Sequence, residues 1–354
     1  MQRARSTIET APPSGEAALR VSFFIPEEDR PDTLLGLEPD RDWQKMRRKQ
    51  RWVLQTALRL RDAGCNVEIT GRIPSEGMVV YHARHGKHLM RQINGRGRPI
   101  LVGIRGDNRE SVMADFEIVQ NGRFHDGERR FFIPYWPQPG LVPRDPRRGE
   151  RVERIAFKGF QQNLHPDFLS SSWKDWCCEH GLDWVIDTVP WERSEEVGVE
   201  ADWHDYSDID VVLAIRPPAT RSHERRGHTS KPANKLVNAW LAGVPAVLGE
   251  EFAYREAGSP GVDYLESDTL EEAKRSILRL RHEPETYRRI VNAGQAKLAA
   301  FQVTAIVREW QSLLYHRIPE IIGRNPVVWS SRRLLGARTV ARKIVRLLHA
   351  RPAR

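Results

Sequence analysis

The sequence predicts an α/β protein made of two doubly wound, parallel-sheet domains. Three observations support this fold class. Short apolar segments alternate with helical segments in both halves of the chain, a pattern typical of parallel sheets covered by helices. A proline-rich segment separates the two halves. Finally, the chain has 354 residues, and a single hydrophobic core usually stops growing at about 250–300 residues.

The first half contains five predicted strands and one long helix. The helix covers residues 43–63 and ends at Gly64, a residue type common just after helices. The strands are apolar runs bounded by proline, glycine or polar residues, at 21–25, 67–70, 78–83, 99–104 and 116–119. In parallel sheets of this kind ligands bind beyond the carboxyl ends of the strands. We therefore expect the loops after these strands to face a cleft.

The proline-rich segment is the predicted domain boundary. Residues 131–149 contain five prolines and two glycines, and proline at this density favours extended chain and stops helices. The chain is thus divided into an N-terminal tail (1–20), an N-terminal domain (21–135), a linker (136–150), a C-terminal domain (151–315) and a C-terminal extension (316–354).

The second half repeats the alternation. Its predicted strands are at 154–157, 183–186, 211–215, 246–248 and 261–265. Its predicted helices are at 173–179, 232–242, 269–282 and 285–314. Both halves therefore predict Rossmann-like domains with a cleft between them.

Residues 231–256 carry the clearest functional signal. Pro232 suits the first position of a helix, and Gly243 followed by Pro245 ends that helix. The start of a helix offers free N–H groups and a positive dipole end, which suit a phosphate. Lys231 and Lys235 add two cations there. We predict an anion site, the alternative being an ordinary α/β crossover whose lysines are solvated surface charges.

The segment 235–247, together with Tyr254-Arg255-Glu256, resembles the donor-nucleotide site of GT-B-fold glycosyltransferases of the group 1, family 4-like kind. The resemblance covers nearly all of residues 20–315 and is strongest at 205–256. It implies the GT-B fold, with a nucleotide-sugar donor held by the second domain, no bound metal and no further cofactor. The chain departs from the family at the two positions where a pair of Glu is usual, because Ser230 and Asn238 stand there.

The resemblance and the local cations together indicate a set of donor-binding residues. Two lysines are the expected diphosphate contacts, because fixed cations stabilise the charge that grows on the leaving group. Glu256 corresponds to the family's carboxylate that faces the donor sugar or ribose. The complete donor-binding set is Arg216, Ser230, Lys231, Asn234, Lys235, Asn238, Tyr254 and Glu256.

Polar residues follow the third and fourth strands of the first half. Asp107 and His85 are candidates for a general base, which an acceptor hydroxyl needs if the anomeric centre inverts. Arg84 and Arg105 are candidates for binding an anionic acceptor such as a lipid-linked phosphate. Core or surface roles are the alternative for all four residues.

The positive charge of the chain is concentrated at its end. The net charge is +9, and residues 331–354 supply +8 of it with seven Arg, one Lys and no acid. Residues 332–350 alternate apolar and basic side chains at helical spacing, which is typical of helices that lie on an anionic membrane surface. Docking onto the N-terminal domain and nucleic-acid binding are the alternatives. Nucleic acid is not the expected partner, because the rest of the chain is close to neutral.

These features together predict a glycosyltransferase of the hexosyl- or deoxyhexosyltransferase type. It would move a sugar from a nucleotide-sugar donor to a cell-surface polysaccharide or glycolipid. The alternatives are a non-catalytic GT-B-like partner subunit, or a sugar-nucleotide epimerase or phosphorylase. The chain has no run of the roughly 20 apolar residues that cross a bilayer, and its three cysteines form no disulfide pattern. We expect a cytoplasmic protein, peripheral at the inner face of the plasma membrane.

Overall fold

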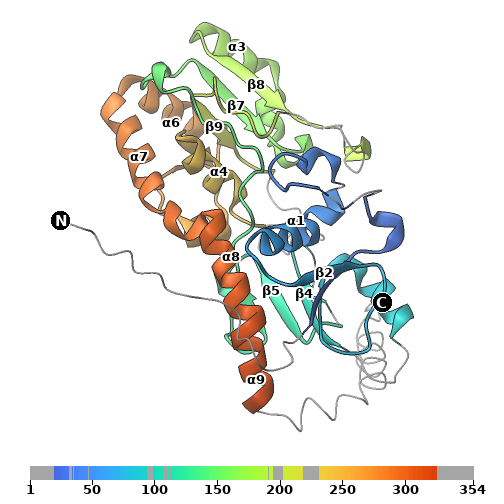
Figure 1. Cartoon of the computed structure of the whole chain (residues 1–354). Helices are drawn as coiled ribbons and strands as arrows, with labels where there is room; N and C mark the ends of the chain where they lie inside the picture. The colour runs from blue at the N-terminus through green and yellow to red at the C-terminus, as the bar shows by residue number, and fades with distance from the viewer. Residues whose placement is uncertain are drawn as a thin grey trace, which may run out of the picture.

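The computed structural model describes most of the chain as two α/β halves (Figure 1). The described residues are 20–31, 34, 36–46, 48–93, 99–106, 108, 110–111, 113–189, 191–193, 202–217 and 231–324. The N-terminal tail up to residue 19 and the basic segment 332–350 lie outside them. Within the described ranges, every strand pairs with its neighbours in parallel. The predicted fold class is therefore confirmed.

The first domain is built on a six-stranded sheet in the order β2-β1-β3-β4-β5-β6. Its strands are β1 (Val21–Phe24), β2 (Val67–Thr70), β3 (Met78–His82), β4 (Ile100–Ile104), β5 (Phe116–Val119) and β6 (Arg130–Phe132). The sequence indicated the first five. The sixth was missed because prolines follow it closely, yet Phe131 anchors it in the core.

Two helices from the N-terminal half of the chain accompany this sheet. The predicted helix 43–63 is a 3-10 turn at Trp43–Lys45 followed by α1 (Arg48–Asp62). The apolar face of α1, including Val53, Leu54 and Ala57, is buried in the first core. A short helix that the sequence did not predict, α2 (Gly86–Gln92), begins soon after β3.

The second domain is built on a five-stranded sheet in the order β11-β10-β9-β7-β8. Its strands are β7 (Arg154–Lys158), β8 (Asp183–Asp187), β9 (Val211–Ala214), β10 (Ala246–Leu248) and β11 (Leu265–Glu266). Its helices are α3 (Ser171–Glu179), α4 (Asn234–Ala242), α5 (Phe252–Ala257), α6 (Leu270–His282) and α7 (Pro284–Ala296). The chain leaves β7 toward β8 on one side and reaches β9 on the other. The strand order therefore reverses beside β7, which is where open α/β sheets bind ligands.

The last described helices belong to the first domain, which corrects the predicted boundary at residue 315. The predicted helix 285–314 is broken. After α7 comes a 3-10 turn at Leu298–Phe301, then α8 (Val303–Ser312), a π-helical turn and α9 (Ile318–Arg324). Ile306, Trp310 and Leu314 are buried in the first core, and α8 lies against α1. Figure 1 shows α8 and α9 running alongside the first sheet.

Part of the predicted linker is fixed to the second domain. Asp210, which is fully buried, accepts hydrogen bonds from Arg144 Nη2 at 2.6 Å and Arg148 Nη2 at 2.8 Å. The backbone N–H groups of Glu153 and Arg154 also donate to it, both at 2.9 Å. A buried carboxylate is stable only when it is paired and hydrogen-bonded in this way. The segment 144–154 is therefore held as one unit with the second sheet.

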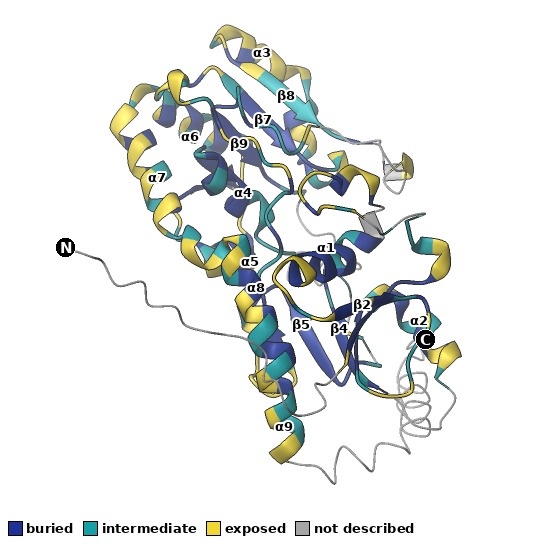
Figure 2. Ribbon diagram, viewed as in Figure 1, coloured by how far each residue is buried: buried dark blue, intermediate teal, exposed yellow. Residues whose placement is uncertain are grey.

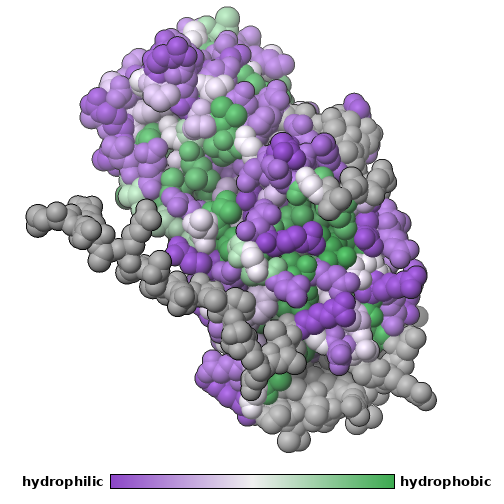
Figure 3. Space-filling model, in the orientation of Figure 1, coloured by the Kyte–Doolittle hydropathy of each residue, from purple (hydrophilic) through white to green (hydrophobic). Residues whose placement is uncertain are grey.

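Burial follows the same two-domain plan. Most strands are dark in Figure 2, whereas the edge strand β8 is mainly intermediate, and the outward faces of α3, α6 and α7 are exposed, as expected for sheets covered by helices. On the face shown in Figure 3 hydrophilic residues predominate, with hydrophobic ones gathered mainly toward the middle of the view. Among the described helices, none combines the length and apolar character needed to span a bilayer.

Candidate functional site

A cavity of about 250 Å³ lies between the two domains, and we call it the cationic cleft. Five of its twenty lining residues are Lys or Arg and none is Asp or Glu. The lining residues are Trp43, Arg51, Trp52, Gln55, His82, Arg84, Tyr135, Gln138, Pro139, Lys158, Gly159, Phe160, Asn163, Trp203, Tyr206, Arg216, Pro232, Asn234, Lys235 and Asn238. They include the chain just after β7 and β9, where the strand order reverses. This composition suits an anionic ligand.

Lys235 is one of the five cations that line this cleft. It stands in the first turn of α4, and its Nζ donates to the carbonyl of Lys158 and lies 4.7 Å from the centre of the Phe157 ring. Desolvation by burial, reinforced by the nearby Arg216 charge, lowers the pKa of Lys235 to about 7. It forms no ion pair with the described carboxylates. An anion that enters the cleft would restore the charge of this ammonium.

Gly159 lies close to the end of Lys235. A Cβ atom at residue 159 would lie 2.5 Å from Lys235 Nζ, so a side chain there would displace the flexible end of the lysine. The hydrogen bond from Lys235 to the carbonyl of Lys158 joins two segments that are 77 residues apart in the chain.

The other two cations that line the cleft from the second domain, Arg216 and Lys158, already have partners. Arg216 donates from Nε to Glu251 Oε1 at 2.7 Å and from Nη1 to Asn163. Lys158 forms an ion pair with Asp187 and donates to the carbonyl of Asp202 at 2.8 Å. These partners fix the direction of each side chain and offset part of its charge. Both side chains are thus held in fixed directions as hydrogen-bond donors, and neither is a free charge.

The start of α4 contributes backbone donors beside Lys235. The helix begins at Asn234, two residues later than the position predicted from Pro232, and its N-cap residue Ala233 makes no side-chain capping bond. The first N–H groups of a helix lack partners within the helix and face the positive end of its dipole. Asn234 itself also lines the cleft.

Asn238, which replaces the family's usual Glu, has a structural partner. Its side chain is nearly buried, and its Oδ1 accepts a hydrogen bond from the backbone N–H of Gln138 at 3.0 Å. Residue 138 belongs to the segment that joins the domains. Asn238 therefore ties the donor-side helix to the linker while it lines the cleft.

Three other predicted donor residues do not line the cationic cleft. Tyr254 is buried in the second core, where its ring contacts that of Tyr264. The carbonyl of Lys231 accepts a hydrogen bond from Asn121 Nδ2 at 2.8 Å. The carboxylate of Glu256 reaches the first domain, as described below. The fourth, Ser230, lies outside the described residues.

The first-domain candidates are separated by the fold. Arg84 lines the cleft and donates from Nε to Asn108 Oδ1 at 3.0 Å. His85 is buried behind it, with Nε2 3.3 Å from Asp29 Oδ2, and burial lowers its pKa. Arg105 lines neither cavity described in this section and lies over the Phe124 ring at 4.6 Å. Asp107 lies outside the described residues.

The cleft also contains residues that sequence reasoning missed. His82 lines it from the end of β3, and its Nδ1 accepts the N–H of Arg84 at 3.3 Å. This bond leaves the proton of the neutral ring on Nε2. The available signal was the position of His82 as the last residue of a buried strand.

Aromatic side chains form much of the remaining wall. The rings of Trp52 and Tyr135 lie 3.6 Å apart between centroids, and those of Phe160 and Trp203 meet edge to face at 5.0 Å. Such rings offer flat faces to a base or a sugar. The sequence pattern places Trp52 only on a helix, because its spacing does not distinguish a cleft-facing residue from a core residue.

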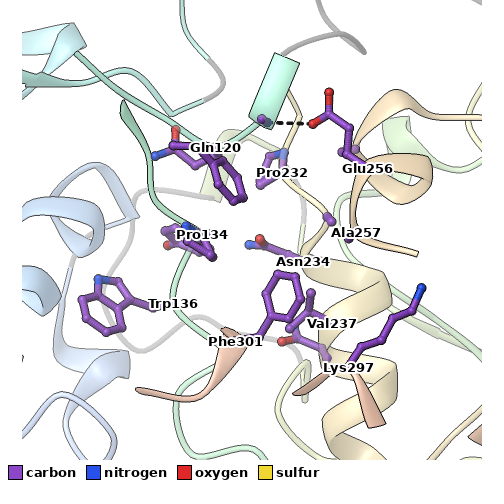
Figure 4. Close-up of a pocket in the computed structure, with 16 residues that line it drawn as sticks. Gln120, Pro134, Trp136, Pro232, Asn234, Val237, Glu256, Ala257, Lys297 and Phe301 are labelled. Atoms are coloured by element: carbon purple, nitrogen blue, oxygen red, sulfur yellow. Dashed lines mark hydrogen bonds between the residues drawn. The ribbon is translucent and has the colours of Figure 1, made fainter. Parts of the chain in front are cut away.

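A second cavity, of about 360 Å³, adjoins the cationic cleft and is shown in Figure 4. We call it the apolar pocket, because ten of its sixteen lining residues are apolar or aromatic. The lining residues are Gln120, Gly122, Phe132, Pro134, Tyr135, Trp136, Pro232, Ala233, Asn234, Val237, Asn238, Ala253, Glu256, Ala257, Lys297 and Phe301. Four of them also line the cationic cleft, so the two cavities share a wall. In the described part of the chain, no three His, Cys, Asp or Glu side chains are grouped to hold a metal ion.

Comparisons with known proteins identify the fold. No protein-family model and no curated protein sequence matches the chain. Among solved structures, a sucrose-phosphate synthase from Thermosynechococcus elongatus is 12% identical, with 83% of this chain and 98% of that chain covered and a TM-score of 0.51. HepE from Anabaena, solved with UDP-glucose, is 12% identical, covers 83% and 99% of the two chains and has a TM-score of 0.48. The pneumococcal O-GlcNAc transferase GtfA, solved with UDP and GlcNAc, is 11% identical, covers 76% and 60%, and has a TM-score of 0.46. The two parallel sheets and the similarity to the first of these structures show that this chain has the GT-B fold.

Proposed function

We propose that the protein is a glycosyltransferase that binds the diphosphate of a nucleotide-sugar donor in the cationic cleft. The observation that carries the proposal is Lys235, a desolvated cation without a carboxylate partner at the start of α4, beside the point where the strand order reverses. Arg216 and the first two residues of α4, Asn234 and Lys235, line the same cavity. This arrangement suits two adjacent phosphates.

The chemistry follows from where charge develops. In glycosyl transfer the acceptor hydroxyl oxygen forms a bond to the anomeric carbon while the bond from that carbon to the phosphate oxygen breaks. The electron pair leaves with the nucleoside diphosphate, and the hydroxyl proton is released. Oriented donors and cations aimed at the leaving phosphate stabilise the growing charge. A bound phosphate would raise the pKa of Lys235 and so keep its ammonium protonated. Arg216 is already oriented by Glu251.

The remaining wall of the cleft has a part in substrate binding. Phe160 and Trp203 offer ring faces for the nucleobase. His82 lines the cleft from the first domain and is a further polar contact for a substrate. Arg84 places a cation on the first-domain side, where an anionic acceptor group would enter.

Nucleotide binding tests this proposal. Wild-type protein is titrated with UDP, GDP and dTDP and with their sugar conjugates, and the melting temperature and heat of binding are recorded. We expect at least one nucleotide to stabilise the protein, and Lys235→Ala to weaken its binding at least tenfold. Lys274→Ala, which alters a second-domain lysine paired with Glu271 on α6, serves as the control. Absence of binding by all nucleotides, or equal binding by Lys235→Ala and wild type, would reject the proposal.

The acceptor and the location are further parts of the proposal. The basic, amphipathic pattern of residues 332–350 supports an acceptor at an anionic membrane surface, namely a cell-surface polysaccharide or glycolipid receiving a hexose or deoxyhexose. Protein lacking residues 331–354 is expected to lose sedimentation with anionic vesicles and to keep nucleotide binding. Sedimentation that is unchanged by this deletion would reject the membrane role alone.

One observation favours a second candidate, a non-catalytic GT-B-like partner subunit. Asn238 occupies a position where the resembling family has Glu, and its side chain bonds the linker. A partner subunit would bind nucleotide yet release no sugar from any donor, even with a cell lysate supplying acceptors. Donor turnover in that assay would exclude this candidate.

A further inference from the structure

The first domain contributes two arginines and three large aromatic rings to the cationic cleft. We call these residues, Arg51, Arg84, Trp43, Trp52 and Tyr135, the first-domain wall. Arg51 and Trp52 stand near the start of α1, and Arg84 lies in the 3-10 turn that follows β3. Cations beside ring faces suit a ligand that carries an anionic group on a ring.

Two contacts fix the direction of Arg51. Its Nε donates to the carbonyl of Met46 at 3.0 Å, and its guanidinium carbon lies 5.0 Å from the centre of the Trp43 ring. Trp43 is buried, so this ring is a fixed support. A guanidinium that stacks on a fixed ring presents its planar N–H groups in a defined direction. Arg51 is therefore oriented before a ligand arrives.

Arg84 is oriented by the loop that follows β4. Its Nε donates to Asn108 Oδ1 at 3.0 Å, and Asn108 Nδ2 in turn donates to the carbonyl of Arg105 at 3.2 Å. The loop turns at Gly106, whose φ of 58° lies in the left-handed region that favours glycine. The Arg84 side chain is exposed, and the bond to Asn108 holds it in one direction. A planar guanidinium held in this way fits the oxygens of a carboxylate or phosphate.

A pair of rings accompanies the two arginines. Trp52 and Tyr135 lie 3.6 Å apart between ring centres, and the Trp52 ring lies 6.3 Å from that of His82, two residues before Arg84. Both rings of the pair are half-buried and line the cleft. The C–H groups on the face of a sugar ring lose contact with water when they pack against such rings. The ring pair therefore suits a sugar, and the arginines suit an anionic substituent on it.

A sugar on this wall would share one cavity with the donor. Lys235 and Arg216, which are assigned to the donor diphosphate, line the same cleft as the first-domain wall. Transfer requires the acceptor hydroxyl to come within about 3–3.5 Å of the reacting carbon, so the acceptor must bind in this cavity. Like charges repel across a narrow cleft. A second anion beside the diphosphate therefore needs cations of its own, and Arg51 and Arg84 supply them.

We infer that the first-domain wall binds an acidic sugar as the acceptor. Its carboxylate or phosphate group is recognised by Arg51 and Arg84, and its ring packs against Trp52 and Tyr135. Such a sugar would be the terminal residue of the cell-surface polysaccharide or glycolipid. The word acceptor rests on the proposed function. Binding of an acidic sugar depends only on the arginines and the rings, so it is measurable without a donor.

Matched pairs of sugars test the ligand class by calorimetry, in the absence and presence of UDP. Methyl glucuronide and methyl galacturonide carry a carboxylate that methyl glucoside and methyl galactoside lack. The 6-phosphates of glucose and galactose carry a phosphate that the free sugars lack. We expect at least one acidic sugar to bind about tenfold more tightly than its neutral counterpart, because charge-assisted hydrogen bonds are the stronger ones. The pair that shows the preference identifies the anionic group as carboxylate or phosphate, and no preference in any pair overturns the inference.

Variants of the first-domain wall test the place of binding. Arg51→Gln and Arg84→Gln should each lose most of the preference for the acidic sugar, whereas the control Arg72→Gln, at a side chain that is 90% exposed, should keep it. Loss of the preference in either cleft variant supports the inference, and a preference retained in both overturns it. Trp52→Leu and Tyr135→Leu should weaken binding of the acidic sugar and keep its preference over the neutral one. Unchanged binding in both ring variants overturns the inference as well.

The same samples separate this inference from the proposed function. Lys235→Ala should lose nucleotide binding and keep the acidic sugar, and Arg51→Gln should do the reverse. If an acidic sugar binds and no nucleotide does, the proposed function fails and the sugar site stands. If a nucleotide binds and no acidic sugar is preferred, the inference fails and the proposed function stands. If the nucleotide displaces the acidic sugar one for one, the sugar occupies the donor site and the inference is overturned.

Discussion

Glu256 on α5 of the second domain caps the 3-10 turn at Gly122 in the first domain. Its Oε2 accepts the Gly122 N–H at 2.8 Å, and its Oε1 accepts the Arg123 N–H at 3.1 Å. The Arg123 guanidinium also lies over the Phe252 ring at 3.9 Å. The carboxylate that the family resemblance assigns to the donor sugar thus joins the two domains across the apolar pocket.

Removing this carboxylate should loosen the domain contact. Glu256→Ala leaves two backbone donors without their acceptor, so we expect a loss of about 1 kcal/mol in the free energy of unfolding and a larger radius of gyration in X-ray scattering. Glu271→Ala, an exposed change within the second domain, is the control. An unchanged scattering profile for Glu256→Ala would mean that other contacts hold the domains together.

The affinity for nucleotide should depend on pH through Lys235. The free protein has a Lys235 pKa of about 7, and a bound phosphate raises it. Affinity is therefore highest where Lys235 is already protonated, and it falls by up to about tenfold per pH unit as the pH rises above 7. Calorimetric titrations with UDP between pH 7 and 9 measure this slope. Lys235→Met should abolish the slope, and a slope retained in that variant would assign it to another group.

Lys235 should lower the free energy of unfolding of the protein without bound nucleotide. The unfolded chain holds its Lys235 proton up to about pH 10.5, whereas the folded chain loses it near pH 7. The unfolded state binds more protons in this window, so stability rises with pH across it and the penalty is complete below pH 7. Lys235→Met should therefore gain roughly 1–3 kcal/mol at pH 6, and the gain should shrink toward pH 10. Urea unfolding at both pH values checks the sign, and a gain that grows with pH would contradict it.

Asn238 should contribute to stability as well as to the cleft wall. Asn238→Ala leaves the partly buried N–H of Gln138 without its acceptor, which costs about 1–2 kcal/mol. Asn292→Ala, at an exposed position on α7, should cost less than about 0.5 kcal/mol. Chemical unfolding compares the two variants. Equal small losses would show that the linker does not depend on this bond.

The C-terminal helices should stabilise the first domain. Trp310 is 3% exposed and lies in the first core, so Trp310→Ala should lose about 3–5 kcal/mol. Hydrogen exchange should accelerate in α1 and β1 more than in the second sheet. Faster exchange confined to the second domain would instead support the boundary at residue 315 that the sequence predicted.

The sequence predicted most strands correctly because buried parallel strands are short, continuous apolar runs. It missed β6, whose three residues adjoin prolines, and α5, which is a short helix in a polar segment. It also assigned residues 303–315 to the wrong domain. The apolar face of an amphipathic helix shows that the helix is covered, but the pattern does not say which core covers it.

The candidate site was predicted only in part for a related reason. The start of a helix indicated Lys235, but its low pKa arises from burial in the folded protein and from the nearby Arg216 charge, neither of which the local sequence shows. Glu256 and Tyr254 were chosen from the family resemblance, and their contacts depend on the packing of α5 against the first domain and the second core. The aromatic wall was not visible, because spacing along a helix cannot separate residues that face a cleft from those that face a core.

The chain crosses between the domains twice, once through residues 133–141 and again through 297–302. Two crossings act as two fixed pivots, so the domains can rotate about the line that joins them but cannot slide or twist freely past each other. Trp136 belongs to the first crossing and Phe301 to the second, and both line the apolar pocket. The apolar pocket is therefore bordered by both connections, so such a rotation would displace its walls less than parts of the two domains that lie farther from the connections.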